Sequence, residues 1–119
     1  MEINFKNEVS SVLPFDVGLC LFRVLQEALH NSVKHSGVKR VDVQLREHAN
    51  EVHLTVSDSG KGFDVEAAKQ HGGLGLASMQ ERVRIVNGTI EIQSRPAAGT
   101  TIRVRVPFKL EGASRRAAG

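Results

Sequence analysis

The sequence predicts an α/β two-layer sandwich, in which a mixed, mostly antiparallel sheet carries helices on one face only. Two observations predict it. First, every expected strand alternates between apolar and polar residues, which indicates one buried face and one solvated face. A parallel sheet with helices on both faces would need strands that are apolar throughout. Second, the expected elements follow one another as helix, hairpin, loop, helix, hairpin.

The first helix is expected to begin at Pro14 and Asp16 and to run to about His35, where Ser36 and Gly37 end it. A short edge strand over residues 2–5 precedes it. The apolar positions of the first helix lie on one side, and a separate polar stripe runs along the other, formed by Arg23, Glu27, Asn31 and Lys34.

Alternation predicts four further strands, over residues 41–46, 52–57, 90–93 and 102–106. Ala49 and Asn50 mark the first hairpin turn, and residues 96–99 mark the second. A glycine-rich stretch over residues 58–75 separates the hairpins. It leads into a second helix over residues 76–87, for which Gly88 is well placed as the C-terminal cap.

The length of 119 residues allows one domain, assigned to residues 1–108, followed by a tail over 109–119 that is expected to be disordered. The absence of Trp and Tyr argues against nucleic-acid binding by aromatic stacking. The net charge of +3 is mild and by itself says little about binding to DNA or anionic lipid. Cys20 is alone, so no disulfide framework is expected. Without a visible signal peptide or membrane span, the expected location is cytoplasmic; a membrane anchor of a parent protein would lie outside this sequence.

The polar stripe of the first helix is one candidate site. Glu27, Asn31 and Lys34 are spaced to lie on one face over successive turns. Together a carboxylate, an amide oxygen and an ammonium group can hold a hydrated Mg²⁺ ion and its phosphates, since Mg²⁺ needs only one or two protein oxygens. On this spacing alone, a solvated helix face is the better explanation.

A second candidate follows an apolar strand, at Asp58-Ser59-Gly60-Lys61-Gly62-Phe63. Asp58 shares the inward parity of Val56, and a buried carboxylate needs a hydrogen-bond donor. The exocyclic amine of adenine would serve, and Gly60 and Gly62 would let the backbone approach the base. An ordinary Asp-Ser-Gly turn is an equally good explanation at this point.

Two glycine signals complete the set. Residues 72–76, Gly-Gly-Leu-Gly-Leu, lead directly into the second helix, where backbone N–H groups can bind phosphate. The segment is neither a Walker A loop nor a dinucleotide fingerprint. The run Gly99-Thr100-Thr101 opens the last strand and is unremarkable by itself.

The order of these motifs is more specific than any one of them. E-x-x-x-N-x-x-K-H, D-x-G-x-G-F, G-G-x-G-L-x-x-M-x-E-R and G-T-T resemble the nucleotide boxes of the GHKL ATPases, which implies the Bergerat ATP-binding fold. Within these, the chain resembles the catalytic domain of bacterial sensor histidine kinases, most closely the nitrate-sensor (NarX-like) subfamily, of which residues 21–28 are very typical. The resemblance covers about residues 14–107.

The resemblance implies ATP and Mg²⁺ as ligands, with Asn31 as the metal ligand. Residues at the metal and phosphates would be Glu27, Asn31, Lys34, His35, Gly73, Gly75 and Leu76. Residues around adenine would be Asp58, Gly60, Gly62, Phe63 and Thr101. Glu27 would organise the Mg²⁺ shell or a bound water. Strand parity, however, places Thr100 on the apolar face, so a bulge near the strand start is expected if Thr101 is to reach adenine.

The function implied is donation of the γ-phosphate of Mg·ATP to a histidine on a separate dimerisation helix domain, with a response regulator as the indirect recipient. None of the five histidines lies in such a helix, so the chain is expected to be a monomeric fragment. Residues 64–71 resemble a short lid, mobile without nucleotide. The alternatives are an anti-sigma-factor serine kinase of the same superfamily and a non-catalytic binding module with a degenerate pocket.

Overall fold

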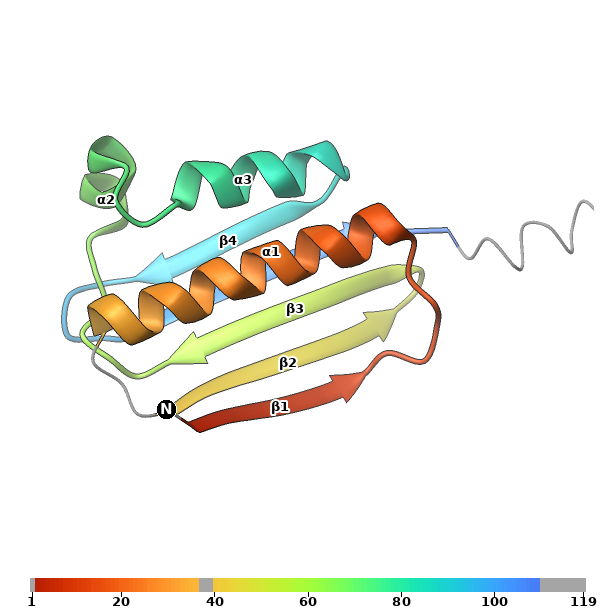
Figure 1. Cartoon of the computed structure of the whole chain (residues 1–119), viewed down its shortest axis with the longest axis horizontal. Helices are drawn as coiled ribbons and strands as arrows, with labels where there is room; N and C mark the ends of the chain where they lie inside the picture. The colour runs from red at the N-terminus through yellow and green to blue at the C-terminus, as the bar shows by residue number, and fades with distance from the viewer. Residues whose placement is uncertain (1, 37–39, 110–119) are drawn as a thin grey trace, which may run out of the picture.

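The computed structural model describes residues 2–36 and 40–109 and contains a five-stranded sheet with helices on one face (Figure 1). The strand order is β1-β2-β3-β5-β4, and β1 is parallel to β2 whereas the other neighbours are antiparallel. The strands are β1 (Glu2–Glu8), β2 (Arg40–His48), β3 (Glu51–Asp58), β4 (Thr89–Ser94) and β5 (Thr100–Pro107). The predicted mixed, mostly antiparallel two-layer sandwich is confirmed.

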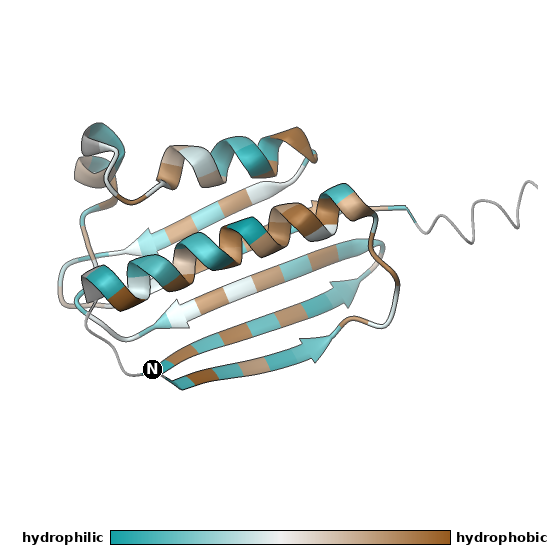
Figure 2. Ribbon diagram, viewed as in Figure 1, coloured by the Kyte–Doolittle hydropathy of each residue, from teal (hydrophilic) through white to brown (hydrophobic). Residues whose placement is uncertain are grey.

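The helical layer consists of α1 (Phe15–Asn31), the π-helical turn η1 (Ser32–Ser36), α2 (Val65–His71) and α3 (Leu76–Ile85). In Figure 2 apolar and polar residues alternate along the strands and form stripes along the helices. The core lies between α1, α3 and the inward face of the sheet. Its fully buried side chains include Val24, Val41, Val52, Leu54, Met79, Val83, Val104 and Val106. One-sided coverage therefore follows from the alternation, as predicted.

Differences from the predicted boundaries are clearest at the edge strand, at the end of the first helix and in the loop after β3. The edge strand is longer than expected and spans Glu2–Glu8. The first helix is α-helical only to Asn31 and continues as η1, whose wider turn changes the direction of the side chains that follow. Within the expected loop, α2 begins at an N-cap, since the side chain of Asp64 accepts a hydrogen bond from the Ala67 N–H.

The second helix ends at Ile85, and its cap is not Gly88. The residue in the left-handed conformation is Asn87, with φ +61°. Its N–H bonds the Arg84 carbonyl, and the Gly88 N–H bonds the Val83 carbonyl at 2.9 Å, which together form a Schellman motif. Glycine suits position 88 for another reason, because a Cβ there would lie 2.8 Å from the Arg105 carbonyl oxygen.

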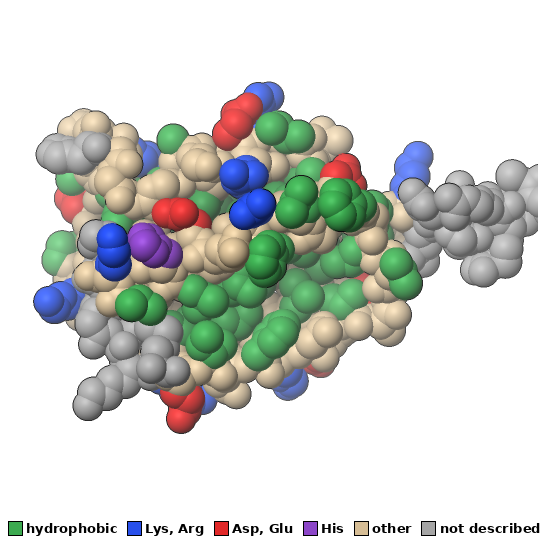
Figure 3. All heavy atoms as spheres, in the orientation of Figure 1, with side chains coloured by type: hydrophobic (Ala, Val, Ile, Leu, Met, Phe, Trp, Pro, Cys, Tyr) green, Lys and Arg blue, Asp and Glu red, His purple; other side chains and the backbone are tan. Residues whose placement is uncertain are grey.

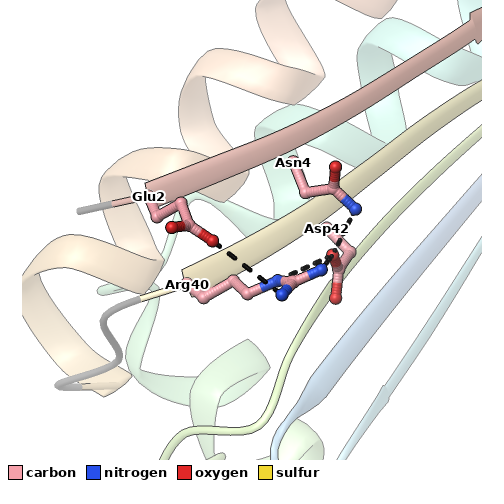
Figure 4. A network of polar contacts seen from close by, with 4 residues as sticks. All are labelled: Glu2, Asn4, Arg40 and Asp42. Atoms are coloured by element: carbon pink, nitrogen blue, oxygen red, sulfur yellow. Dashed lines mark hydrogen bonds and ion pairs between the residues drawn. The ribbon is translucent and has the colours of Figure 1, made fainter.

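The edge strand β1 is fastened to β2 by polar contacts at its start (Figure 4). The Asn4 side-chain amide donates to Asp42 Oδ1 at 3.0 Å, and the Arg40 guanidinium donates to the same oxygen. These hydrogen bonds, that of Asn4 first, lower the pKa of Asp42. Arg40 also reaches Glu2 at 3.8 Å. The network stabilises the parallel pairing of a strand that has only one neighbour.

The helices leave the β1 side of the sheet partly uncovered. Apolar side chains gather between α1 and the β1 edge in Figure 3. Ile3 and Phe5 of β1 are 49% and 57% exposed, and Phe22 of α1 is 53% exposed. This apolar surface is the part of the sandwich that the helical layer does not bury.

No helix in the described ranges is both long enough and apolar enough to cross a bilayer. Cys20 is buried, as the sequence suggests, and desolvation raises the pKa of its thiol. The expected tail lies outside the described residues except for Lys109, so the division at residue 108 stays a prediction.

Candidate functional site

A cavity opens where the end of α1 meets the end of β3 and the start of β5. Its walls are mostly apolar, with a few polar groups from different elements. They are Ala28, Asn31, Ser32, Val56, Asp58, Gly62, Phe63, Leu74, Thr100 and Ile102. Concave, largely apolar walls with a few convergent polar groups are typical of small-molecule sites.

Asp58 lies in the cavity as the last residue of β3. It faces the same side of the sheet as Val56, as strand parity predicts, and it pairs with Thr100 of the neighbouring strand β5. Its Oδ2 accepts a hydrogen bond from the Ser32 hydroxyl at 2.8 Å, and its Oδ1 accepts one from the Gly60 N–H at 3.0 Å. These donors fix the carboxylate, which keeps lone pairs for a donor in the cavity.

Gly62 holds the loop after β3 against the turn between β4 and β5. Its φ of +66° is left-handed, and a Cβ there would collide with the Arg95 carbonyl. The next residue, Phe63, donates its backbone N–H to the Ser94 hydroxyl at 2.8 Å. The backbone at this position must therefore stay bare for Phe63 to line the cavity.

Asn31, the last residue of α1, carries an unpaired acceptor. Its Nδ2 donates to the Leu74 carbonyl at 2.8 Å, which sets the orientation of the amide. Its Oδ1 is buried, and no group of the described residues hydrogen-bonds to it. A buried acceptor needs a partner, and an amide oxygen suits Mg²⁺ or a water bound to it. The residues present therefore fit the metal that the resemblance implies.

The other residues of the predicted polar stripe lie differently. Glu27 is half-buried and packs against Gly75, where a Cβ would lie 2.5 Å from the Glu27 Oε1. Lys34 is exposed on η1 and does not line the cavity. The side chain of His35 lies outside the described part of the chain. Two side chains of α1 thus contact the same short segment: Glu27 packs against Gly75, and Asn31 hydrogen-bonds to Leu74.

The glycine-rich segment supplies Leu74 to the cavity. Gly73 is exposed, with open space around it, whereas Gly75 has a φ of +68° and forms the N-cap of α3. Leu76, predicted at the nucleotide, is 2% exposed in the hydrophobic core and absent from the cavity wall. The side chain of Leu76, the first residue of α3, turns into the core, and Leu74 lines the cavity instead. Contact of Leu76 with a nucleotide stays a prediction.

The bulge expected near the start of β5 is not there. Pairing runs without interruption through Ser57 opposite Thr101 and Asp58 opposite Thr100. Thr101 consequently lies on the other face of the sheet, where its hydroxyl is 3.2 Å from that of Ser57. Thr100 lines the cavity, and its hydroxyl is 2.8 Å from that of Ser94.

Sequence reasoning missed several lining residues, namely Ala28, Ser32, Val56, Leu74 and Ile102. For two of them the signal was available, because Val56 and Ile102 share the inward parity of Asp58 and Thr100. Ala28 and Ser32 lie one turn apart on the inward side of the helix end. Leu74 had no periodic signal, since it belongs to an irregular segment.

Residues 17–110 match the family of histidine kinase-, DNA gyrase B- and HSP90-like ATPases. Because the match spans most of the chain, the protein belongs to this family, as an ATP-binding domain of the histidine kinase type. The predicted resemblance is confirmed at this level, while the nitrate-sensor subfamily stays a prediction.

Two curated relatives are signal transduction histidine-protein kinase/phosphatases named DegS. The chain is 39% identical to that of Brevibacillus brevis over 98 residues, which is 82% of this chain and 25% of the relative. It is also 39% identical to that of Bacillus subtilis (strain 168) over 94 residues, 77% of this chain and 24% of the relative. The chain therefore spans about a quarter of these relatives.

Solved structures share the fold. The histidine kinase domain of the Erythrobacter litoralis EL346 blue-light activated histidine kinase matches with a TM-score of 0.68 and 21% identity, over 89% of this chain and 52% of that one. The catalytic domain of histidine kinase ThkA matches with a TM-score of 0.73 and 18% identity, over 92% and 80%. At these identities the likeness concerns the fold.

Proposed function

We propose that this domain binds Mg·ATP in the cavity and donates the γ-phosphate to a histidine on a separate dimerisation and phosphoacceptor helix domain. A response regulator would receive the phosphoryl group indirectly. One observation carries the proposal: the cavity pairs a fixed carboxylate, Asp58, with a buried and unpaired amide oxygen, Asn31 Oδ1. An acceptor for a base amine and a ligand for a cation are what a metal–nucleotide complex requires.

In this proposal, adenine occupies the half of the cavity near Asp58. The exocyclic amine donates to the carboxylate, which Ser32 and Gly60 hold in place. The apolar walls from Val56 and Ile102 exclude water from the base. A base that lacks this amine would leave the half-buried carboxylate without its donor, so the arrangement favours adenine.

The triphosphate extends from there toward Asn31 and the start of α3. The backbone N–H groups at the N-terminus of α3 have no side-chain cap, which leaves them for phosphate oxygens. Lys34, about one turn beyond Asn31 on η1, would supply positive charge for the phosphates. The same role is proposed for His35, whose side chain lies outside the described part of the chain. A magnesium ion bound at Asn31 would supply neutralisation of phosphate charge.

Phosphoryl transfer needs little covalent chemistry from this domain, because placement and charge neutralisation dominate it. An imidazole nitrogen of the acceptor would bond to the γ-phosphorus as the bond to the bridging oxygen breaks and ADP leaves. Among the histidines whose side chains the structure describes, His30, His48 and His53 do not line the cavity. We expect the acceptor histidine on another domain. We also expect a cytoplasmic, monomeric domain that binds no nucleic acid.

The test is incubation with γ-labelled ATP, with and without the dimerisation helix domain of the parent protein added in trans. The domain alone should stay unlabelled, and the helix domain should gain acid-labile label, since phosphohistidine is acid-labile. Transfer should be slow, because the tether and its effective concentration are lost. Acid-stable label on a protein serine would favour the serine kinase alternative, and strong labelling of the domain alone would contradict the proposal.

A further inference from the structure

Glu27 places a carboxylate beside the start of α3. Its side chain packs so closely against Gly75 that a Cβ at that position would lie 2.5 Å from Oε1 and 2.7 Å from the carboxyl carbon. Gly75 is the N-cap of α3, and the first turn of that helix carries no acidic residue of its own. Glu27, from α1, is thus the acidic group that adjoins this helix end.

The Glu27 carboxylate has no polar partner among the described residues. Within residues 2–36 and 40–109, Glu27 forms no ion pair and no side-chain hydrogen bond. One helical turn further along α1, Asn31 holds the carbonyl of Leu74 and leaves Oδ1 buried and unpaired. A fixed negative charge and an unsatisfied cation ligand therefore flank the same two residues, Leu74 and Gly75.

This juxtaposition has an electrostatic consequence for any phosphate bound there. The N-terminus of a helix attracts anions, but a carboxylate at the same place repels them. A nucleotide without a metal ion is repelled by the Glu27 carboxylate. When a cation lies between the carboxylate and the phosphates, the interaction of Glu27 with the bound complex becomes attractive, because Glu27 then attracts the metal.

We propose that Glu27 is a specificity-determining residue that makes the site reject metal-free nucleotide and accept the metal complex. The inference rests on the proposed function and names which state of the nucleotide the site selects. It assigns Glu27 a role through charge at the helix end, whereas Asn31 supplies the ligand.

Isothermal calorimetry of ADP and ATP binding, with Mg²⁺ and with chelator, tests this. The isosteric Glu27→Gln keeps the packing against Gly75 and removes only the charge. We expect it to tighten nucleotide binding in chelator roughly fivefold or more, the size of a near-surface charge repulsion, and to weaken binding in Mg²⁺, because the attraction between Glu27 and the metal is lost. Glu27→Asp keeps the charge, so in chelator it should bind nucleotide about as weakly as the parent domain does.

Glu91→Gln is the matched control, since it removes one exposed carboxylate on β4, where Glu91 pairs with Arg103. It should leave both affinities unchanged. Equal effects of Glu27→Gln with and without metal, or weaker binding in chelator, would overturn the inference while leaving ATP binding by the parent domain intact. Failure of the unaltered domain to bind ATP under either condition would instead remove the proposed function and this inference with it.

Discussion

The side-chain nitrogen of Asn31 donates a hydrogen bond to the carbonyl of Leu74 at 2.8 Å, which joins the end of α1 to the segment that leads into α3. Because this bond uses the nitrogen, the oxygen of the same amide is left buried without a partner in the described residues. The same side chain therefore positions the glycine-rich segment and offers a ligand toward the cavity.

Asn31→Ala should weaken ATP binding more in the presence of Mg²⁺ than in chelator, because the amide oxygen is the proposed metal ligand and the adenine contacts lie elsewhere. Calorimetry under both conditions measures the difference. Gln26→Ala, an exposed polar truncation on the same helix, should leave both affinities unchanged. Equal losses under both conditions would count against Asn31 as the metal ligand.

Ser32→Ala should reduce ATP affinity by about 1 kcal/mol, because the Ser32 hydroxyl holds one oxygen of Asp58 at 2.8 Å. The carboxylate would keep its bond from the Gly60 N–H but turn more freely. Fluorescence titration with an ATP analogue measures the loss. An affinity equal to that of the parent domain would show that Ser32 does not position the carboxylate.

Thr100→Val and Thr101→Val form a matched pair that differs only in the face of the sheet. Both substitutions keep the β-branched shape and remove one hydroxyl. Thr100→Val should weaken adenine-nucleotide binding, because Thr100 lines the cavity, whereas Thr101→Val should not. If the order of the two affinities is reversed, β5 must shift its register when nucleotide binds.

Gly75→Ala should destabilise the domain by more than about 1 kcal/mol, since φ is +68° and the new methyl group meets the Glu27 carboxylate. Glu27→Ala should relieve the second cost but not the first. Chemical denaturation of both single variants and the double variant measures the coupling. Strictly additive free energies of unfolding would mean that the two side chains do not contact each other.

The sheet and its inward residues could be predicted because alternation reports directly on burial. Asp58 and Val56 share a parity that the register confirms, and the same parity already favoured Thr100 over Thr101. The motif-based assignment of Thr101 required a bulge, and no feature of the β5 sequence produces one. Here the physical pattern was the better guide to position.

The irregular parts could not be predicted in the same way. The change from α1 to the π-turn η1 at Ser32 leaves no mark in helical periodicity, so the orientation of Lys34 was not predictable. Leu74 and Leu76 are identical residue types two positions apart in a glycine-rich segment. Only the point at which α3 begins decides that Leu76 enters the core and Leu74 the cavity.

The central claim is that the cavity at Asp58 is an adenine-nucleotide site, and calorimetric titration of the domain with Mg·ATP tests it most directly. The parent domain should bind with a stoichiometry near one. Asp58→Asn should lose about 1–3 kcal/mol of binding free energy, because an amide can turn a donor toward the adenine amine. Asp42→Asn, on the exposed face of β2, should bind as the parent does. Unchanged affinity in Asp58→Asn, or equal losses in both variants, would contradict the account.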